Sequence, residues 1–176
     1  MAVVWACIYD PRSSGVANKL LSLWGAGPVT WLGDPNYALG AIIVIMIWQA
    51  AGYYMVMHIA ALDSISENIY EAASIDGATA ADKFFRITIP LMRDIIGITL
   101  IFSLSGTLGI SFVLTQVMTG GGPGNATMVL GLYVYNMAFG TSVNVGYSMA
   151  MTVIPMLLGV IISTVSRRFS YSRENQ

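Results

Sequence analysis

Charge is scarce in this sequence, and the positions of the charges are informative. Only 10% of the residues are charged and 56% are hydrophobic, whereas about 25% of the residues in an ordinary soluble domain are charged. The stretch 95–166 contains no Asp, Glu, Lys, Arg or His, and His58 is the only such residue between Pro35 and Asp63. Soluble folds rarely tolerate such stretches, so we expect lipid to be the main solvent of this chain.

Cysteine and histidine are almost missing, which excludes several kinds of chemistry. A single Cys (Cys7) cannot form an internal disulfide or a thiolate metal cage, and a single His cannot supply a His-rich site. We therefore expect no metal, no cofactor and no catalytic residue, and an intramembrane enzyme lacks its acid, base or nucleophile. The net charge of -1 provides no basic field for nucleic acid.

Three apolar stretches are long enough to cross a bilayer as helices: 38–61, 95–118 and 145–165. The first would be about 36 Å long, against a hydrocarbon core of about 30 Å. Pro155 lies inside the third and predicts a kink. Residues 1–9 are apolar but too short to cross, and we interpret them as the end of a truncated helix. The predicted fold is an all-α membrane protein with three complete transmembrane helices and one partial helix.

Lys and Arg residues predict the orientation of these helices. They lie mainly after the first and third spans, at Lys83, Arg86, Arg93, Arg167, Arg168 and Arg173, and the other loops hold only Arg12 and Lys19. The positive-inside rule places the 63–93 loop and the 166–176 tail, with the C-terminus, in the cytoplasm, and the loops 10–37 and 119–144 outside. The apolar stretch 128–139 predicts a short interfacial or re-entrant helix, although a fourth crossing stays possible.

The cytoplasmic loop 63–93 has the signals of a helix, a turn and a second helix. Capping boxes are indicated by Ser64 with Glu67 and by Thr79 with Asp82, and helix ends by Gly77 and by Pro90. Alanines make the predicted surface shallow, which suits the close approach of a partner protein. From the pattern alone, an amphipathic connector lying on the lipid surface is an equally good interpretation.

The loop sequence EAASIDGATAADKFFRITIP resembles the EAA loop of binding-protein-dependent ABC transporter permeases. The matching positions are Glu71, Ala72, Ala73, Asp76, Gly77, Ala78, Phe84, Ile87 and Pro90. WLGDP from Trp31, TGGGPGNAT from Thr119 and YVYNMAF from Tyr133 are similar to the carbohydrate branch of this family, the maltose and glycerol-phosphate type first permease. Members usually have more spans than this chain, so the resemblance indicates an N-terminally truncated member.

The resemblance implies a multi-pass permease subunit of an ABC importer in the inner membrane of a prokaryote. Its expected solute is a sugar or related polyol, delivered by an extracytoplasmic solute-binding protein. Its other expected partners are a second permease subunit and a cytoplasmic ATP-binding subunit dimer, which the EAA loop would engage through Glu71, Ala72, Ala73, Asp76, Gly77 and Ala78. A passive channel, an assembly scaffold or an incomplete permease fragment are the alternatives.

Candidate solute contacts lie on the first two spans. Hydroxyls recur every four residues at Thr99, Ser103, Thr107, Ser111 and Thr115. The ladder predicts either solute contacts or hydrogen bonds of each hydroxyl to its own helix. Related permeases favour Thr107 and Ser111, on the helix after the EAA loop. Gln49 and Tyr53 lie one turn apart on the first span and offer an amide and a phenol, whereas His58 is expected to be a packing residue.

Overall fold

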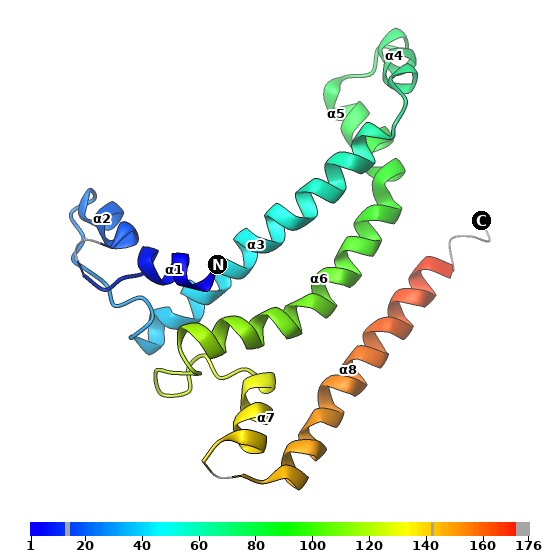
Figure 1. Ribbon diagram of the computed structural model, residues 1–176. Helices are drawn as coiled ribbons and strands as arrows, with labels where there is room; N and C mark the ends of the chain where they lie inside the picture. Colours follow the sequence, from blue (N-terminus) through cyan, green and yellow to red (C-terminus); the bar gives the residue numbers. More distant parts are fainter. Residues whose placement is uncertain (13–14, 142, 172–176) are drawn as a thin grey trace. The chain divides into compact units, whose positions relative to one another are not determined.

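The computed structural model describes residues 1–12, 15–141 and 143–171, with the backbone alone at 162, 163 and 165–171. Every regular element in these ranges is a helix. In chain order they are α1 (Ala2–Ile8), α2 (Val16–Ser22), α3 (Pro35–Asp63), α4 (Glu67–Ile75), α5 (Ala80–Asp82), the π-helix η1 (Lys83–Thr88), α6 (Ile89–Met118), α7 (Leu130–Phe139) and α8 (Val145–Tyr171) (Figure 1). The all-α fold predicted from the sequence is confirmed.

The chain divides into two units. The first comprises Met1–Trp48 and Ser105–Ile161, and the second comprises Gln49–Leu104 and the chain after Ile161. The three unit boundaries fall inside α3, α6 and α8, so each of these helices contributes to both units. The first unit contains a hydrophobic core and the two predicted outer loops, and the second contains the predicted EAA loop.

Helix α3 extends the first predicted span at both ends. The Asp34 carboxylate accepts a hydrogen bond from the backbone N–H of Asn36 at 2.8 Å, and Pro35 occupies the first helical position. An Asp followed by Pro favours a helix start, because the carboxylate satisfies a free N–H and the proline has none to lose. The helix therefore begins at Pro35 instead of residue 38, and it ends at Asp63.

Helices α6 and α8 contain the second and third predicted spans. Two helical stretches, Pro35–Asp63 and Ala80–Met118, are long and apolar enough to cross a membrane. Helix α8 continues through Pro155, and its described apolar part, Val145–Ile161, is shorter than those two. The count of three spans therefore stays a prediction. In the predicted tail 166–176, residues 172–176 lie outside the described residues.

Large apolar side chains cover the outer surfaces of the long helices. Ile47 and Val56 of α3 are 63% and 65% exposed, and Leu100 of α6 is 59% exposed. Soluble monomers rarely expose continuous apolar surface of this kind, because each exposed side chain forgoes the free energy of leaving water. These faces therefore need lipid or other protein subunits against them.

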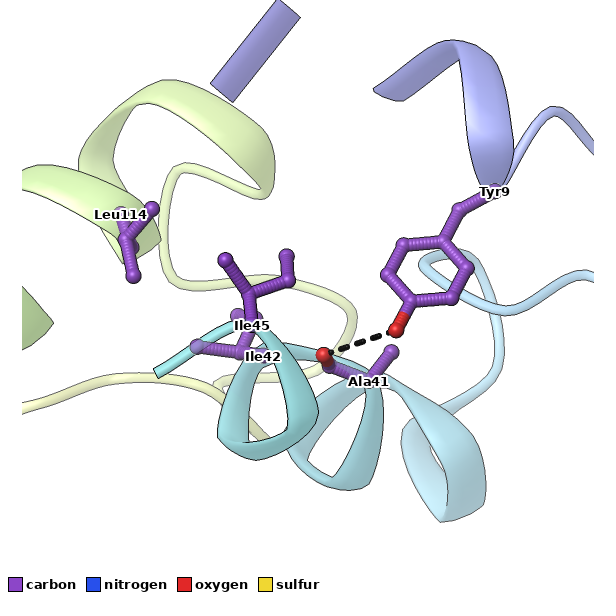
Figure 2. Packing of buried hydrophobic residues seen from close by; sticks show 5 residues of the cluster. All are labelled: Tyr9, Ala41, Ile42, Ile45 and Leu114. Carbon is purple, nitrogen blue, oxygen red and sulfur yellow. Dashed lines mark hydrogen bonds between the residues drawn. The ribbon is translucent and has the colours of Figure 1, made fainter. Parts of the chain in front are cut away.

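The core of the first unit joins α1 to α3 and α6. Its buried residues are Tyr9, Ala41, Ile42, Ile45 and Leu114 (Figure 2). The Tyr9 hydroxyl donates a hydrogen bond to the backbone oxygen of Ala41 at 3.2 Å. The Tyr9 ring also packs between Trp5 and Trp31, with ring centroids 5.6 and 5.8 Å away. Residues 2–8 of the predicted partial helix 1–9 form α1, and Tyr9, which follows it, fastens α1 to the first half of α3. That α1 is the end of a transmembrane helix stays a prediction.

The predicted outer loop 10–37 contains a helix, α2, that the sequence analysis does not predict. Its Asn18 is only 2% exposed. The Asn18 amide nitrogen donates to the backbone oxygens of Val29 at 3.0 Å and Asp10 at 3.2 Å. The Asn18 side-chain oxygen accepts from the Val29 N–H at 3.0 Å and from Trp31 Nε1 at 2.9 Å. One side chain thus ties the start of the loop to its end.

The glycine-rich segment from Thr119 forms a closed turn. Thr127 is 1% exposed, and its hydroxyl lies 2.6 Å from the Thr119 hydroxyl and donates to the Gly122 oxygen at 2.7 Å. Gly120, Gly121 and Gly124 have positive φ, a conformation that glycine adopts at low cost. Helix α7 follows and confirms the short helix predicted within 128–139.

Replacement of Asn18 by Ala should destabilise the first unit. The change leaves the Val29 N–H and Trp31 Nε1 without their acceptor, and we expect a loss of about 2 kcal/mol from such buried groups. The midpoint of thermal unfolding in detergent, followed by tryptophan fluorescence, measures the effect. Asn36→Ala is the matched control, because Asn36 is exposed and should change stability by less than about 0.5 kcal/mol. Equal midpoints for both variants would contradict the assignment.

Candidate functional site

The first helix of the predicted EAA loop, α4, begins later than predicted. Its N-cap is Ser66, without a side-chain capping bond, so the predicted capping box of Ser64 with Glu67 is wrong. The Ser64 hydroxyl instead donates to the Ala61 oxygen at 2.7 Å, at the end of α3. Local pattern could not decide this, because the same hydroxyl can cap the following helix or bond to the preceding one.

The turn after α4 is a Schellman motif centred on Gly77. The Ala78 N–H donates to the Ala73 oxygen at 2.9 Å, and the Gly77 N–H donates to the Ser74 oxygen at 3.1 Å. These are the two hydrogen bonds of that motif, which needs a left-handed residue at its centre. Gly77 has φ +78°, so the helix end predicted at this glycine is confirmed.

The second helix begins with the predicted capping box. The Asp82 N–H donates to the Thr79 hydroxyl oxygen at 3.2 Å, and the Thr79 N–H donates to the Asp82 carboxylate at 3.2 Å. The hydrogen bonds from Thr79 hold the pKa of Asp82 below its usual range, because they stabilise the ionised carboxylate. Arg86 lies 3.5 Å from the same carboxylate, one turn further on.

Pro90 does not end the second helix, contrary to the prediction. It is the second residue of α6, and helical structure continues from Ala80 to Met118. The π-helix η1 (Lys83–Thr88) lies immediately before this proline. A π-helical turn shifts the backbone hydrogen bonds near Pro90, which has no N–H to donate. The helix can therefore continue past the proline ring without breaking.

The predicted coupling residues gather at the tip of this hairpin, which Figure 1 shows at the junction of α3 and α6. Glu71, Ala72, Asp76 and Gly77 are exposed, and Ala73 and Ala78 are partly exposed. Glu71 and Asp76 make no ion pair within the described part of the chain. Ile75 is 87% exposed beside them. The tip therefore presents two carboxylates and one large apolar side chain on a shallow surface.

Two predicted pathway residues, Gln49 and Tyr53, lie in the second unit on α3. Gln49 is partly exposed, and Tyr53 is 66% exposed with its ring edge-on to Tyr54 at 5.2 Å between centroids. His58, one turn beyond Tyr54, lies 2.7 Å from the Tyr54 backbone oxygen through Nδ1 and 3.5 Å from Thr99 Oγ1 through Nε2. These contacts agree with the prediction that His58 is a packing residue.

The hydroxyl ladder of α6 bonds largely to its own helix. Ser111 Oγ donates to the Leu108 oxygen at 3.0 Å, and Thr115 Oγ1 donates to the Ser111 oxygen at 2.8 Å. Thr99 and Thr115 are buried, whereas Thr107 is exposed and Ser111 is partly exposed. The self-bonding interpretation therefore describes Ser111 in this structure, although a hydroxyl oxygen that donates once can still accept. Thr107 and Ser111 belong to the first unit, whereas Gln49 and Tyr53 belong to the second.

Sequence reasoning missed a pair of residues that connects the two helices of the hairpin. The Tyr70 and Thr88 hydroxyls lie 2.9 Å apart. No local pattern relates residues 18 positions apart, and η1 has no periodicity signal of its own. The only available signal was that Tyr70 directly precedes the EAA letters.

Among the residues with described side chains, no group of three or more potential metal ligands is found.

Comparison with known proteins assigns the chain to a family. The model of the binding-protein-dependent transport system inner membrane component matches residues 1–175. The chain belongs to this family. The EAA resemblance is thus confirmed at the level of family membership.

Three relatives show how this family member compares with longer proteins. YurN, a probable ABC transporter permease protein of Bacillus subtilis, is 32% identical over 96% of the chain and 58% of the relative. LacF, the lactose transport system permease protein of Rhizobium radiobacter, is 36% identical over 92% of the chain and 54% of the relative. A chain of a bacterial alginate ABC transporter, solved with an alginate pentasaccharide-bound periplasmic protein, matches with a TM-score of 0.81 and 25% identity over 97% of this chain and 60% of its own. This chain therefore spans little more than half the length of these relatives.

Replacement of Gly77 by Ala should loosen the hairpin tip. No heavy atom lies within 4 Å of the added Cβ, so the expected cost of about 1 kcal/mol comes from the positive φ alone. Hydrogen exchange of the segment from Ala73 to Asp82 should accelerate. Gly97→Ala is the control, because Gly97 also has open space around it but lies inside α6, where Ala is favoured. Equal acceleration in both variants would contradict the role of the turn.

Proposed function

We propose that this chain is the permease portion of an ABC importer that moves a sugar or related polyol across a prokaryotic inner membrane. The observation that carries this proposal is the family match over residues 1–175, since the matched family is an inner membrane transport component. The solute is delivered by an extracytoplasmic binding protein and crosses with the help of a second permease subunit. Hydrolysis of ATP by a separate cytoplasmic ATPase dimer drives the transport.

The EAA loop is the proposed contact with the ATPase. A partner's backbone can approach the tip closely, because its alanines are short and Gly77 has no side chain. Glu71 and Asp76 have no ionic partner within the described chain, so basic groups of the ATPase are suitable counterparts. Ile75 gives the contact an apolar centre, which is the usual anatomy of a protein interface.

A carbohydrate is the solute class that suits the candidate pathway. Gln49, Tyr53, Thr107 and Ser111 offer amide and hydroxyl groups, and the Tyr53 ring offers a flat face for stacking on a sugar. None of these groups is charged, so a polyhydroxylated solute matches them better than an ion does. The similarity to LacF, a lactose transport system permease protein, supports the same class.

The proposed orientation places the EAA loop and the C-terminus in the cytoplasm. It rests on the Lys and Arg residues of the 63–93 segment and of the chain end, and on the low basic content of the other loops. In this orientation, the Asn18 loop and the Thr119 turn face the binding protein. The ATPase and the binding protein then act on opposite ends of α3 and α6.

Replacement of Glu71 by Ala should weaken ATPase recruitment and reduce uptake. The variant loses one interface carboxylate, and we expect at least about a ten-fold loss of affinity if that group is paired in the complex. The measurement is the yield of ABC ATPase isolated with the tagged chain from host membranes, together with uptake of radiolabelled maltose, lactose and trehalose by the cells. Glu67→Ala is the control, because Glu67 lies one turn earlier on α4 and is also exposed. Unaltered recruitment by the Glu71 variant argues against docking at this tip, and uptake that persists without ATP favours a passive channel.

Gln49→Leu and Tyr53→Phe should raise the KM for the transported disaccharide by about five-fold each, the factor of one ordinary hydrogen bond. Recruitment of the ATPase should stay unchanged, because both residues lie outside the hairpin. Concentration-dependent uptake provides the measurement. Tyr37→Phe serves as the control, since Tyr37 lies in the first turn of α3, about three turns before Gln49. If the KM of both variants equals that of the wild type, neither residue contacts the solute.

A further inference from the structure

Two hydrogen-bonded links join α4 to the π-helix η1. The Tyr70 and Thr88 hydroxyls lie 2.9 Å apart, and Lys83 Nζ donates to Ser74 Oγ. Tyr70 and Ser74 lie one turn apart on α4, and Lys83 and Thr88 are the first and last residues of η1. We call these four residues the hairpin clasp.

The hydrogen bonds of the hairpin clasp have a consistent donor-to-acceptor order. Thr88 Oγ1 donates to the Lys83 oxygen at 3.2 Å, and this uses its only proton. The Tyr70 O–H must therefore donate to Thr88. Ser74 Oγ donates to the Tyr70 backbone oxygen at 2.7 Å and accepts from Lys83. Donation thus runs from Lys83 to Ser74, from Ser74 to the Tyr70 backbone oxygen, from the Tyr70 hydroxyl to Thr88, and from Thr88 to the Lys83 backbone oxygen.

The π-helix explains why both links can form at once. In an α-helix, residues five apart point about 140° away from each other, because each residue advances by about 100°. The wider turn of a π-helix brings residues i and i+5 onto nearly the same side. Lys83 and Thr88 can therefore both face α4, where Tyr70 and Ser74 are separated by four residues. An α-helical segment at 83–88 would lose one of the two links.

The two links are not equal in strength. Thr88 is 8% exposed, and its bond to Tyr70 is partly buried, whereas the Lys83–Ser74 bond is exposed to solvent. An exposed contact of a long lysine side chain contributes little, because water competes for the ammonium group and its ordering costs entropy. The Tyr70–Thr88 bond is therefore the stronger of the two hydrogen-bonded links between α4 and η1.

We infer that Tyr70 and Thr88 are positioning residues that make the hairpin move as one body with α6. This inference rests on the proposed function of the EAA loop. The tip is joined to α6 along the chain only through the Gly77 turn, and that turn would let α4 pivot. The Tyr70–Thr88 bond spans the base of the hairpin next to α6 and prevents the pivot. Force applied by an ATPase on α4 then reaches α6 instead of bending the turn.

The test compares Tyr70→Phe, Thr88→Val and the double variant with the wild type. Each single change removes one hydroxyl and keeps the shape of the side chain. The tagged complex is isolated from host membranes and reconstituted in liposomes, and the amount of maltose, lactose or trehalose moved per ATP hydrolysed is measured. We expect a fall of about five-fold in this ratio for each single variant, with recruitment of the ATPase retained. The double variant should be no worse than the single ones, because all three lack the same bond.

Two controls separate transmission from plain stability. Thr88→Ser keeps the hydroxyl and should restore the ratio, and Tyr135→Phe removes a hydroxyl that makes no hydrogen bond within the described part of the chain. Hydrogen exchange of Glu67–Ile75 should accelerate in Tyr70→Phe but not in Tyr135→Phe. An unchanged ratio in Tyr70→Phe and Thr88→Val overturns the inference, and so does a loss of recruitment, which assigns the bond to folding of the hairpin. Failure of the wild-type chain to recruit any ATPase refutes the proposed function instead.

Discussion

The structure depends on a constraint set by its apolar helix surfaces: a polar group in these helices must find its partner inside the protein. Ser111 and Thr115 donate to carbonyls of their own helix, His58 lies against the Tyr54 carbonyl, and the Tyr9 hydroxyl bonds to Ala41. An unpartnered donor in hydrocarbon costs several kcal/mol, about the net stability of many small proteins. Polar side chains can therefore serve a solute only where they keep a free lone pair or a second proton.

The same constraint separates the hairpin from the long helices. Outside the apolar stretches, Glu71 and Asp76 are exposed and have no ionic partner among the residues with described side chains, and a left-handed Gly77 lies at the exposed tip. Water solvates the two carboxylates and the backbone of the turn, so their exposure costs little free energy. The hairpin thus combines a surface that is open to a partner with an internal set of hydrogen bonds. The proposed function at the tip and the hydrogen bonds at the base have different physical origins.

Local sequence patterns succeeded where one short-range interaction dominated. The Thr79–Asp82 capping box and the Gly77 helix end were predicted, because each involves residues close together in the chain. They failed where two local interactions competed. The Ser64 hydroxyl bonds to the preceding helix, α3. Pro90 is accommodated by the π-helix η1, which hydrophobic periodicity does not predict. Helix α2 was missed because Asn18, a residue typical of loops, stabilises it through bonds to Val29 and Trp31.

The sequence by itself determined the solvent of this chain, the approximate extent of its apolar helices and its family, because composition and closely spaced motifs carry those signals. Only the tertiary structure decided that Tyr70 meets Thr88 and that Asn18 closes a loop. Both are contacts between segments that are distant along the chain. The geometry of these contacts depends on how whole helices run through the fold. A short stretch of sequence does not encode that arrangement.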